Sequence, residues 1–199
     1  RLPELAPEPQ ALETLVRELV ATVNTAVYDT ARTQSQCAGM GTTLVLAVFH
    51  DNRLLAAHIG DSRLYRLRGG QLTQLTRDHS LLQEQIDSGM ISKEEANWSS
   101  NKNLVTRALG VDPEVPLDVN VYDAAPHDMY LLCSDGLSKM VNNDEIRQAL
   151  LDESDIEAAV YGLMELANDR GGKDNITLIL VKVIDRHARA LVTRAPNQS

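Results

Sequence analysis

Apolar residues recur at helical spacing through a long segment near the start of the chain, residues 11–32. This spacing predicts an amphipathic helix with one face against a core. The residues before it, 1–10, contain three prolines and predict an extended lead-in. The apolar positions of the predicted helix are Leu12, Leu15, Val16, Leu19, Val20, Val23, Ala26 and Val27.

After this helix the apolar pattern changes to that of strands. The run TTLVLAVF, residues 42–49, is apolar and β-branched almost throughout, which is typical of a strand covered on both faces. Asp51-Asn52 and Gly69-Gly70 predict tight hairpin turns, and hairpin-linked strands favour an antiparallel sheet over βαβ units. Further strands are predicted at 53–59, 71–75, 104–108, 117–122, 129–133 and 175–184. The last of these, NITLILVKVI, is apolar almost throughout and is predicted to be buried on both faces.

Two capping boxes lie in a polar excursion from the strands, residues 79–102. Ser80-x-x-Gln83 and Ser92-x-x-Glu95 each predict the start of a short helix.

The last part of the chain predicts two more helices and a polar tail, 186–199. Asn143 can cap a helix that runs to about residue 150. Ser154-x-x-Glu157 opens another that Gly171-Gly172 ends. Together these elements predict an α+β fold, a layered sandwich of two antiparallel β-sheets flanked by helices, as one domain over 11–185.

Composition narrows the possible functions. The 199 residues are 43% hydrophobic, enough for a substantial core, and the net charge of −9 argues against nucleic-acid binding. No apolar run approaches the roughly 20 residues that span a bilayer. Two cysteines in a large core, Cys37 and Cys133, fit a reducing compartment and predict a cytoplasmic protein.

Three short acidic turns end or begin apolar runs: Gly60-Asp61-Ser62, Ser134-Asp135-Gly136 and Asp174-Asn175. Each alone has an ordinary explanation, because Asp and Gly are common turn residues and a β-bulge can hold a polar turn. If folding brings the three carboxylates together, they form an all-oxygen site suited to a hard cation.

Five segments resemble, in order, the metal-dependent protein phosphatase family, the PP2C or PPM type. They cover about residues 39–183. The segments are GMGTT at 39–43, HIGDSRLYRLRGGQLTQLTRDHS at 58–80, NLVTRALG at 103–110, YLLCSDGLS at 130–138 and DNITLILV at 174–181.

The resemblance implies metal-dependent hydrolysis of phosphoserine and phosphothreonine on proteins, opposing a cognate cytosolic Ser/Thr kinase. It places Asp135 and Asp174 at positions that hold a dinuclear Mg²⁺ or Mn²⁺ centre, and Asp61 at a third, weaker ion. No phosphoenzyme nucleophile is needed, because a metal-activated water attacks. The excursion at 79–102 resembles the family's flap. The motif residues expected near the site are Gly60, Ser62, Ser134, Gly136 and Asn175.

Other candidates carry weaker signals. His79 is either an acid or orienting group near the site or a helix-entry residue, and His58 is expected to be structural. Arg63 and Arg66 either contact phosphate or belong to a solvated strand face. Cys37 lacks a His/Asn pairing signature and is interpreted as a small packed residue rather than a nucleophile.

The family's first block, with a phosphate-binding Arg and an Asp-Gly-x-Gly-Gly turn that bridges both metals, has no counterpart in this chain. Gly39-Met40-Gly41 lacks the preceding Asp and occupies the later Gly-Thr-Thr position. We therefore expect this chain alone to be impaired in turnover, and a phosphatase-like binding module is the alternative function. A hydrolase of small phosphate esters is a further alternative. Comparing hydrolysis of a phosphothreonine peptide with that of an aryl phosphate separates it from a protein phosphatase.

Overall fold

The structure is a computed structural model that describes residues 9–96, 104–152 and 155–185. The chain divides into two compact units. The first comprises residues 1–50, 54–63 and 76–122, and the second comprises 51–53, 64–75 and 123–199.

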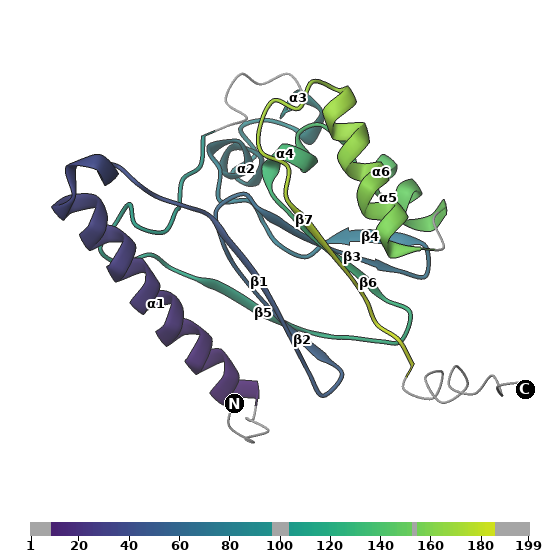
Figure 1. Cartoon of the computed structure of the whole chain (residues 1–199), viewed down its shortest axis with the longest axis horizontal. Helices are drawn as coiled ribbons and strands as arrows, with labels where there is room; N and C mark the ends of the chain where they lie inside the picture. The colour runs from purple at the N-terminus through teal and green to yellow at the C-terminus, as the bar shows by residue number, and fades with distance from the viewer. Residues whose placement is uncertain (1–8, 97–103, 153–154, 186–199) are drawn as a thin grey trace, which may run out of the picture. The chain divides into compact units, whose positions relative to one another are not determined.

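The first unit combines one long helix with a three-stranded sheet. Helix α1 lies along the sheet, and its Val16 and Val20 form a core with Leu55, Ala57 and Ile59 of the strands (Figure 1). The sheet order is β1-β2-β5. The elements are α1 (Pro9–Thr33), the 3-10 helix η1 (Ser35–Cys37), β1 (Leu44–His50), β2 (Arg53–Ile59), α2 (Leu81–Asp87), α3 (Lys93–Ala96) and β5 (Asp118–Asp123).

The second unit is a four-stranded sheet with helices on one face. Its strand order is β4-β3-β6-β7, and the pairs β3–β4 and β6–β7 are antiparallel. Arg63, the first residue of β3, is assigned to the first unit. The elements are β3 (Arg63–Arg68), β4 (Gln71–Gln74), β6 (Met129–Cys133), α4 (Asp135–Ser138), α5 (Asn143–Asp152), α6 (Ile156–Asp169) and β7 (Leu178–Lys182).

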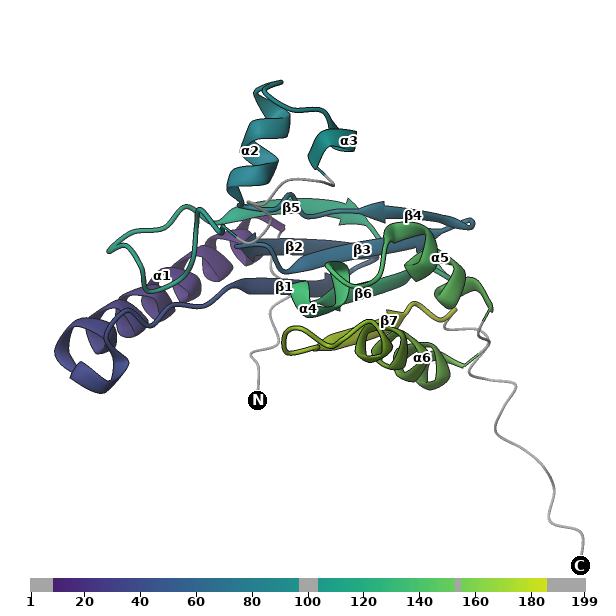
Figure 2. The ribbon, with the colours of Figure 1, turned by 90° about the horizontal axis from the view of Figure 1, so that it is seen from above.

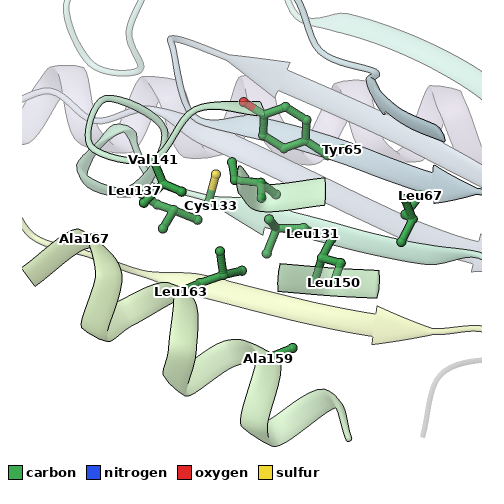
Figure 3. Close-up of a cluster of buried hydrophobic side chains, with 11 residues drawn as sticks. Tyr65, Leu67, Leu131, Cys133, Leu137, Val141, Leu150, Ala159, Leu163 and Ala167 are labelled. Atoms are coloured by element: carbon green, nitrogen blue, oxygen red, sulfur yellow. The ribbon is translucent and has the colours of Figure 1, made fainter. Parts of the chain in front are cut away.

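A buried apolar cluster joins the sheet and helices of this second unit. Leu131 and Cys133 point from β6 toward Leu163 of α6 and Leu137 of α4 (Figure 3). Each of these side chains is at most a few per cent exposed. The apolar face of β6 and the periodic face of α6 thus bury each other, which fixes the end of β6 where Asp135 follows.

The two predicted hairpin turns and the predicted cap at Ser80 are confirmed. Asp51 and Asn52 have φ of 45° and 58°, and Gly69 and Gly70 have φ of 55° and 79°, as tight hairpins require. The hydroxyl of Ser80 caps α2 by accepting the Gln83 N–H, and the two short helices of the excursion lie together in Figure 2.

The Ser92–Glu95 capping box is also confirmed. The Glu95 N–H donates to the Ser92 hydroxyl, and the Glu95 carboxylate accepts from the Ser92 N–H. The predicted first helix is confirmed too, although it begins at Pro9, inside the expected lead-in.

Two strands predicted to be covered on both faces are not. Strands β1 and β7 lie at the ends of their sheet orders, and their side chains are mostly half-buried. Ile179 on β7 is 58% exposed. An apolar composition does not distinguish an edge strand from a central one, because that depends on which strands pair.

The predicted strand at 104–108 is wrong. Within residues 104–108 only Val105 pairs, in an isolated bridge with Ser80, and a second isolated bridge, Thr42 with Leu109, lies just after the segment.

The capping residue of α5 is also shifted, to Asn142, whose side chain accepts the Glu145 N–H. Ser154 lies outside the described residues, and Asp155 caps α6 instead. Among the described residues no helix is long and apolar enough to cross a membrane.

Candidate functional site

Asp135 and Asp174 lie on two neighbouring turns at one end of the β6–β7 pair. Cys133 and Leu178 are the last paired residues, and Ser134 continues the pairing beyond them. The Ser134 N–H donates to the Thr177 carbonyl (2.9 Å), and its hydroxyl accepts the Thr177 N–H (3.0 Å). The same hydroxyl donates to the Asn175 carbonyl (2.9 Å), so Ser134 fastens both turns to each other.

Gly136 brings the two turns into direct backbone contact. A Cβ at this position would lie 2.4 Å from the Asn175 carbonyl oxygen and 3.2 Å from that of Asp174. No side chain fits such a gap, so the glycine is required here by close approach. The structure therefore places the Ser-Asp-Gly and Asp-Asn motifs side by side.

The two carboxylates are available to solvent and suit a hard cation. Asp174 is exposed, and its Oδ1 accepts the Asn175 N–H (2.7 Å), which orients the group. Asp135 is half-buried at the start of α4. Mg²⁺ and Mn²⁺ take oxygen ligands, and Mg²⁺ in particular keeps several waters, so two carboxylates at an open junction fit these ions.

Lys139 is a charged neighbour of this site that the sequence interpretation missed. It lies one helical turn after Asp135, and its ammonium forms an ion pair with Asp135 Oδ2. The i,i+4 spacing from Asp135 was the available signal. A cation that binds Asp135 must compete with this ammonium.

Replacing Lys139 with Met should therefore strengthen Mn²⁺ binding. A partly exposed ion pair contributes at most about 1 kcal/mol, so we expect the dissociation constant in a calorimetric titration to fall by about threefold. Lys182→Met removes the same charge at the far end of β7 and should leave the affinity nearly unchanged. Equal effects of the two changes would contradict a direct competition.

Asp61 lies in the first unit, two residues after the end of β2. The residue is buried, with 6% exposure. Gly60 has φ of +101°, and a Cβ there would lie 2.3 Å from the Thr43 side chain, so both conformation and space require glycine. The hydroxyls of Thr43 and Ser62 bond to each other (2.9 Å). The turn of residues 60–62 is thus held on both sides of Asp61, whose metal role remains a prediction.

His79 is buried, at 6% exposure, and both its ring nitrogens are engaged. Nδ1 accepts the Gly60 N–H (3.1 Å), and Nε2 lies 3.2 Å from Asp118 Oδ2. Burial lowers the pKa of His79 below its ordinary value, against the opposing effect of Asp118, so the ring is neutral at pH 7. The residue also directly precedes the cap of α2, as its helix-entry interpretation requires.

His58, His79 and Asp118 form a cluster whose potential ligand atoms lie within 4.8 Å of one another. Two features oppose a metal site there. The histidine rings are stacked, with centroids 4.6 Å apart, so their in-plane lone pairs do not converge on one ion. His58 Nε2 also donates to the Arg77 carbonyl (2.7 Å). The cluster is better explained as a hydrogen-bonded network.

Two members of this network, Asp118 and Arg107, were not identified from the sequence. Arg107 donates to Asp118 Oδ1 (3.2 Å). Arg63, for which phosphate contact was one alternative, donates to both oxygens of Asp78 through Nε and Nη2 (2.7–3.1 Å). These contacts join residues far apart in the chain, and no local motif signals them.

Comparison with known proteins places these motifs in a family. The family model described as protein phosphatase 2C matches residues 3–180. The chain belongs to the protein phosphatase 2C family. It is 39% identical over 173 residues to the serine/threonine phosphatase stp of Listeria monocytogenes, covering 87% of this chain and 69% of that protein. It is 42% identical over 162 residues to the phosphatase PstP of Mycobacterium tuberculosis, covering 81% of this chain and 31% of that protein.

Solved structures of this family share the fold. Serine/threonine phosphatase Stp1 from Staphylococcus aureus superposes with a TM-score of 0.87 at 34% identity, over 92% of this chain and 72% of that chain. The catalytic domain of PstP in complex with two manganese ions gives 0.79 at 39% identity, over 90% and 74%. The α+β class with two antiparallel sheets and flanking helices is confirmed.

Proposed function

We propose that this chain is a phosphatase that removes phosphate from phosphoserine and phosphothreonine on proteins, opposing a Ser/Thr kinase. The observation that carries the proposal is the contact between the Ser134-Asp135-Gly136 and Asp174-Asn175 turns. It presents two carboxylates on adjacent turns of one sheet end, in a chain whose relatives are named serine/threonine phosphatases.

Asp135 and Asp174 would hold the divalent ions, and Asp61 would serve a further, weaker ion. Mn²⁺ or Mg²⁺ bound there would lower the pKa of a coordinated water and neutralise phosphoryl oxygens. Two catalytic ions are supported by the manganese complex of the related PstP domain.

The protein's own contribution is to keep the carboxylates fixed and accessible. The Ser134 hydroxyl bonds to the Asn175 carbonyl and the Thr177 N–H of the opposing segment, and the backbone at Gly136 lies directly against Asn175. Preorganised ligands lose little conformational freedom when a cation binds, so the entropic cost of binding is small. The excursion at 79–102, with α2 and α3, is proposed to control substrate access.

The test is hydrolysis of a phosphothreonine peptide in Mn²⁺, in Mg²⁺ and in EDTA, with an aryl phosphate in parallel. We expect turnover that requires metal and a higher kcat/KM for the peptide than for the aryl ester, at a reduced rate because Asp135 and Asp174 lack the ligands of the family's first block. Full turnover in EDTA would refute a metal-dependent phosphatase. A preference for the aryl ester would indicate a hydrolase of small phosphate esters instead.

A further inference from the structure

We propose that His79 is a positioning residue whose ring and backbone fix the turn of residues 60–62, and with it Asp61. The proposal rests on the proposed function only where it treats Asp61 as a cation ligand. The fixed turn itself is a structural statement about the first unit.

His79 holds Gly60 at two points. The Gly60 N–H donates to Nδ1 of the ring (3.1 Å), and the His79 N–H donates to the Gly60 carbonyl (2.9 Å). Both backbone groups of Gly60 are therefore bonded to one residue that lies 19 positions later. Because Gly60 precedes Asp61 directly, this pairing sets the direction in which the chain leaves β2.

Gly60 also decides the tautomer of the ring. An N–H donor at Nδ1 requires a lone pair there, so the proton of the neutral ring lies on Nε2. Nε2 then donates to Asp118 Oδ2 (3.2 Å), while Arg107 donates to the other carboxylate oxygen (3.2 Å). Asp118 and Arg107 thus hold the ring in the orientation that Gly60 needs, in the way outer partners orient a metal-ligating histidine.

The remaining sides of the turn are fixed as well. Ser62 bonds to Thr43, and Arg63 pairs with Asp78, the residue before His79. The His58 ring stacks on the His79 ring and limits its rotation. A buried carboxylate between such fixed neighbours has few alternative positions, which lowers the entropic cost of binding a cation.

Two near-isosteric substitutions separate this role from packing. His79→Asn places a carbonyl oxygen close to the position of Nδ1 and keeps an acceptor for Gly60. His79→Gln places its amide close to Nε2, keeps the donor to Asp118 and loses the acceptor. We expect the Gly60 amide to exchange hydrogen about tenfold faster in His79→Gln than in wild type, the value of one lost buried hydrogen bond, and nearly unchanged in His79→Asn.

Metal binding supplies a second measurement. With Mn²⁺ alone as the probe, paramagnetic broadening of the Ser62 amide should require about tenfold more Mn²⁺ in His79→Gln than in His79→Asn. If wild type shows no broadening near Asp61 while Gly60 exchange still separates the variants, Asp61 is not a cation ligand and the positioning of the turn stands. Equal Gly60 exchange in the two variants would overturn the proposal.

A measurement on the unmodified chain does not depend on whether the variants fold. Nitrogen-15 spectra of the His79 ring should show Nδ1 without a proton and Nε2 with one. The opposite tautomer would remove the acceptor from Gly60 and overturn the proposal.

Discussion

Replacing Asp174 with Asn should lower metal-dependent hydrolysis of a phosphothreonine peptide by about 10³-fold, a loss of ~4 kcal/mol in transition-state stabilisation. The amide keeps an oxygen that can accept the Asn175 N–H, as Oδ1 does now (2.7 Å), so the turn should persist. What is lost is the negative charge that a divalent ion requires. The measurement is kcat/KM at saturating Mn²⁺, together with the Mn²⁺ dissociation constant by calorimetry.

Asp155→Asn is the matched control, because it removes one carboxylate from the same unit at the start of α6. Asn caps helices as well as Asp does, so α6 should be unaffected. Asp135→Asn should behave like Asp174→Asn. If the control lowers Mn²⁺ affinity as much as either, the effect is one of overall charge, and the assignment of the two carboxylates is wrong.

Asp128→Asn should destabilise the protein by about 2–3 kcal/mol, the largest stability effect we expect. Asp128 is 1% exposed, and its carboxylate accepts four hydrogen bonds. The donors are Arg68 Nε (2.7 Å), Arg68 Nη2 (2.6 Å), the Ala125 N–H (2.8 Å) and the Tyr130 hydroxyl (2.9 Å). An amide nitrogen in place of one oxygen would face these donors. The Arg68 side chain is 40% exposed, so water replaces part of the hydrogen bonding that its guanidinium loses.

Urea unfolding at pH 7 measures this loss. Glu13→Gln, which breaks the exposed Glu13–Arg17 pair, is the control and should change the midpoint little. A similar midpoint for both variants would contradict a stabilising role for the Asp128 network.

The stability provided by Asp128 should also depend on pH. Burial alone would raise the pKa of Asp128. The hydrogen bonds from Arg68 and Ala125 outweigh burial and hold this pKa below its ordinary value of 3.8. A carboxyl group with a lowered folded-state pKa stabilises fully above the ordinary value, and the stability is lost as pH falls through the folded-state value. The difference between wild type and Asp128→Asn should therefore be constant from pH 7 to about 5 and shrink below about pH 4.

The sequence predicted well wherever a few neighbouring residues decide the structure. The hairpins at Asp51-Asn52 and Gly69-Gly70 need positive φ, which these residues tolerate. The helix periodicity of α1 and the capping boxes are local in the same sense. Strand β7 shows the limit, because its apolar run predicted a covered strand while its place at the end of the sheet order leaves Ile179 exposed.

In the candidate site, too, residues in local motifs were predicted and residues that depend on long-range contacts were not. Asp135 and Asp174 were predicted from their turns, and the antiparallel register of β6 and β7 explains why they become neighbours. Asp118 and Arg107 carried no local signal, because Asp118 contacts His79 from 39 positions away and Arg107 acts through its hydrogen bond to Asp118. Lys139 lies four residues after Asp135, and this spacing brings the two side chains together because a helix, α4, starts at Asp135.

The most direct test of the account is a Mn²⁺ titration of the chain monitored by the amide signals of the second unit. A cation at the Asp135–Asp174 junction should broaden the signals of Gly136 and Asn175 at low Mn²⁺, before those of Asp155 and Glu157 at the start of α6. EDTA should restore them. Simultaneous broadening at both places, or none at Gly136 and Asn175, would contradict a metal site between the two turns.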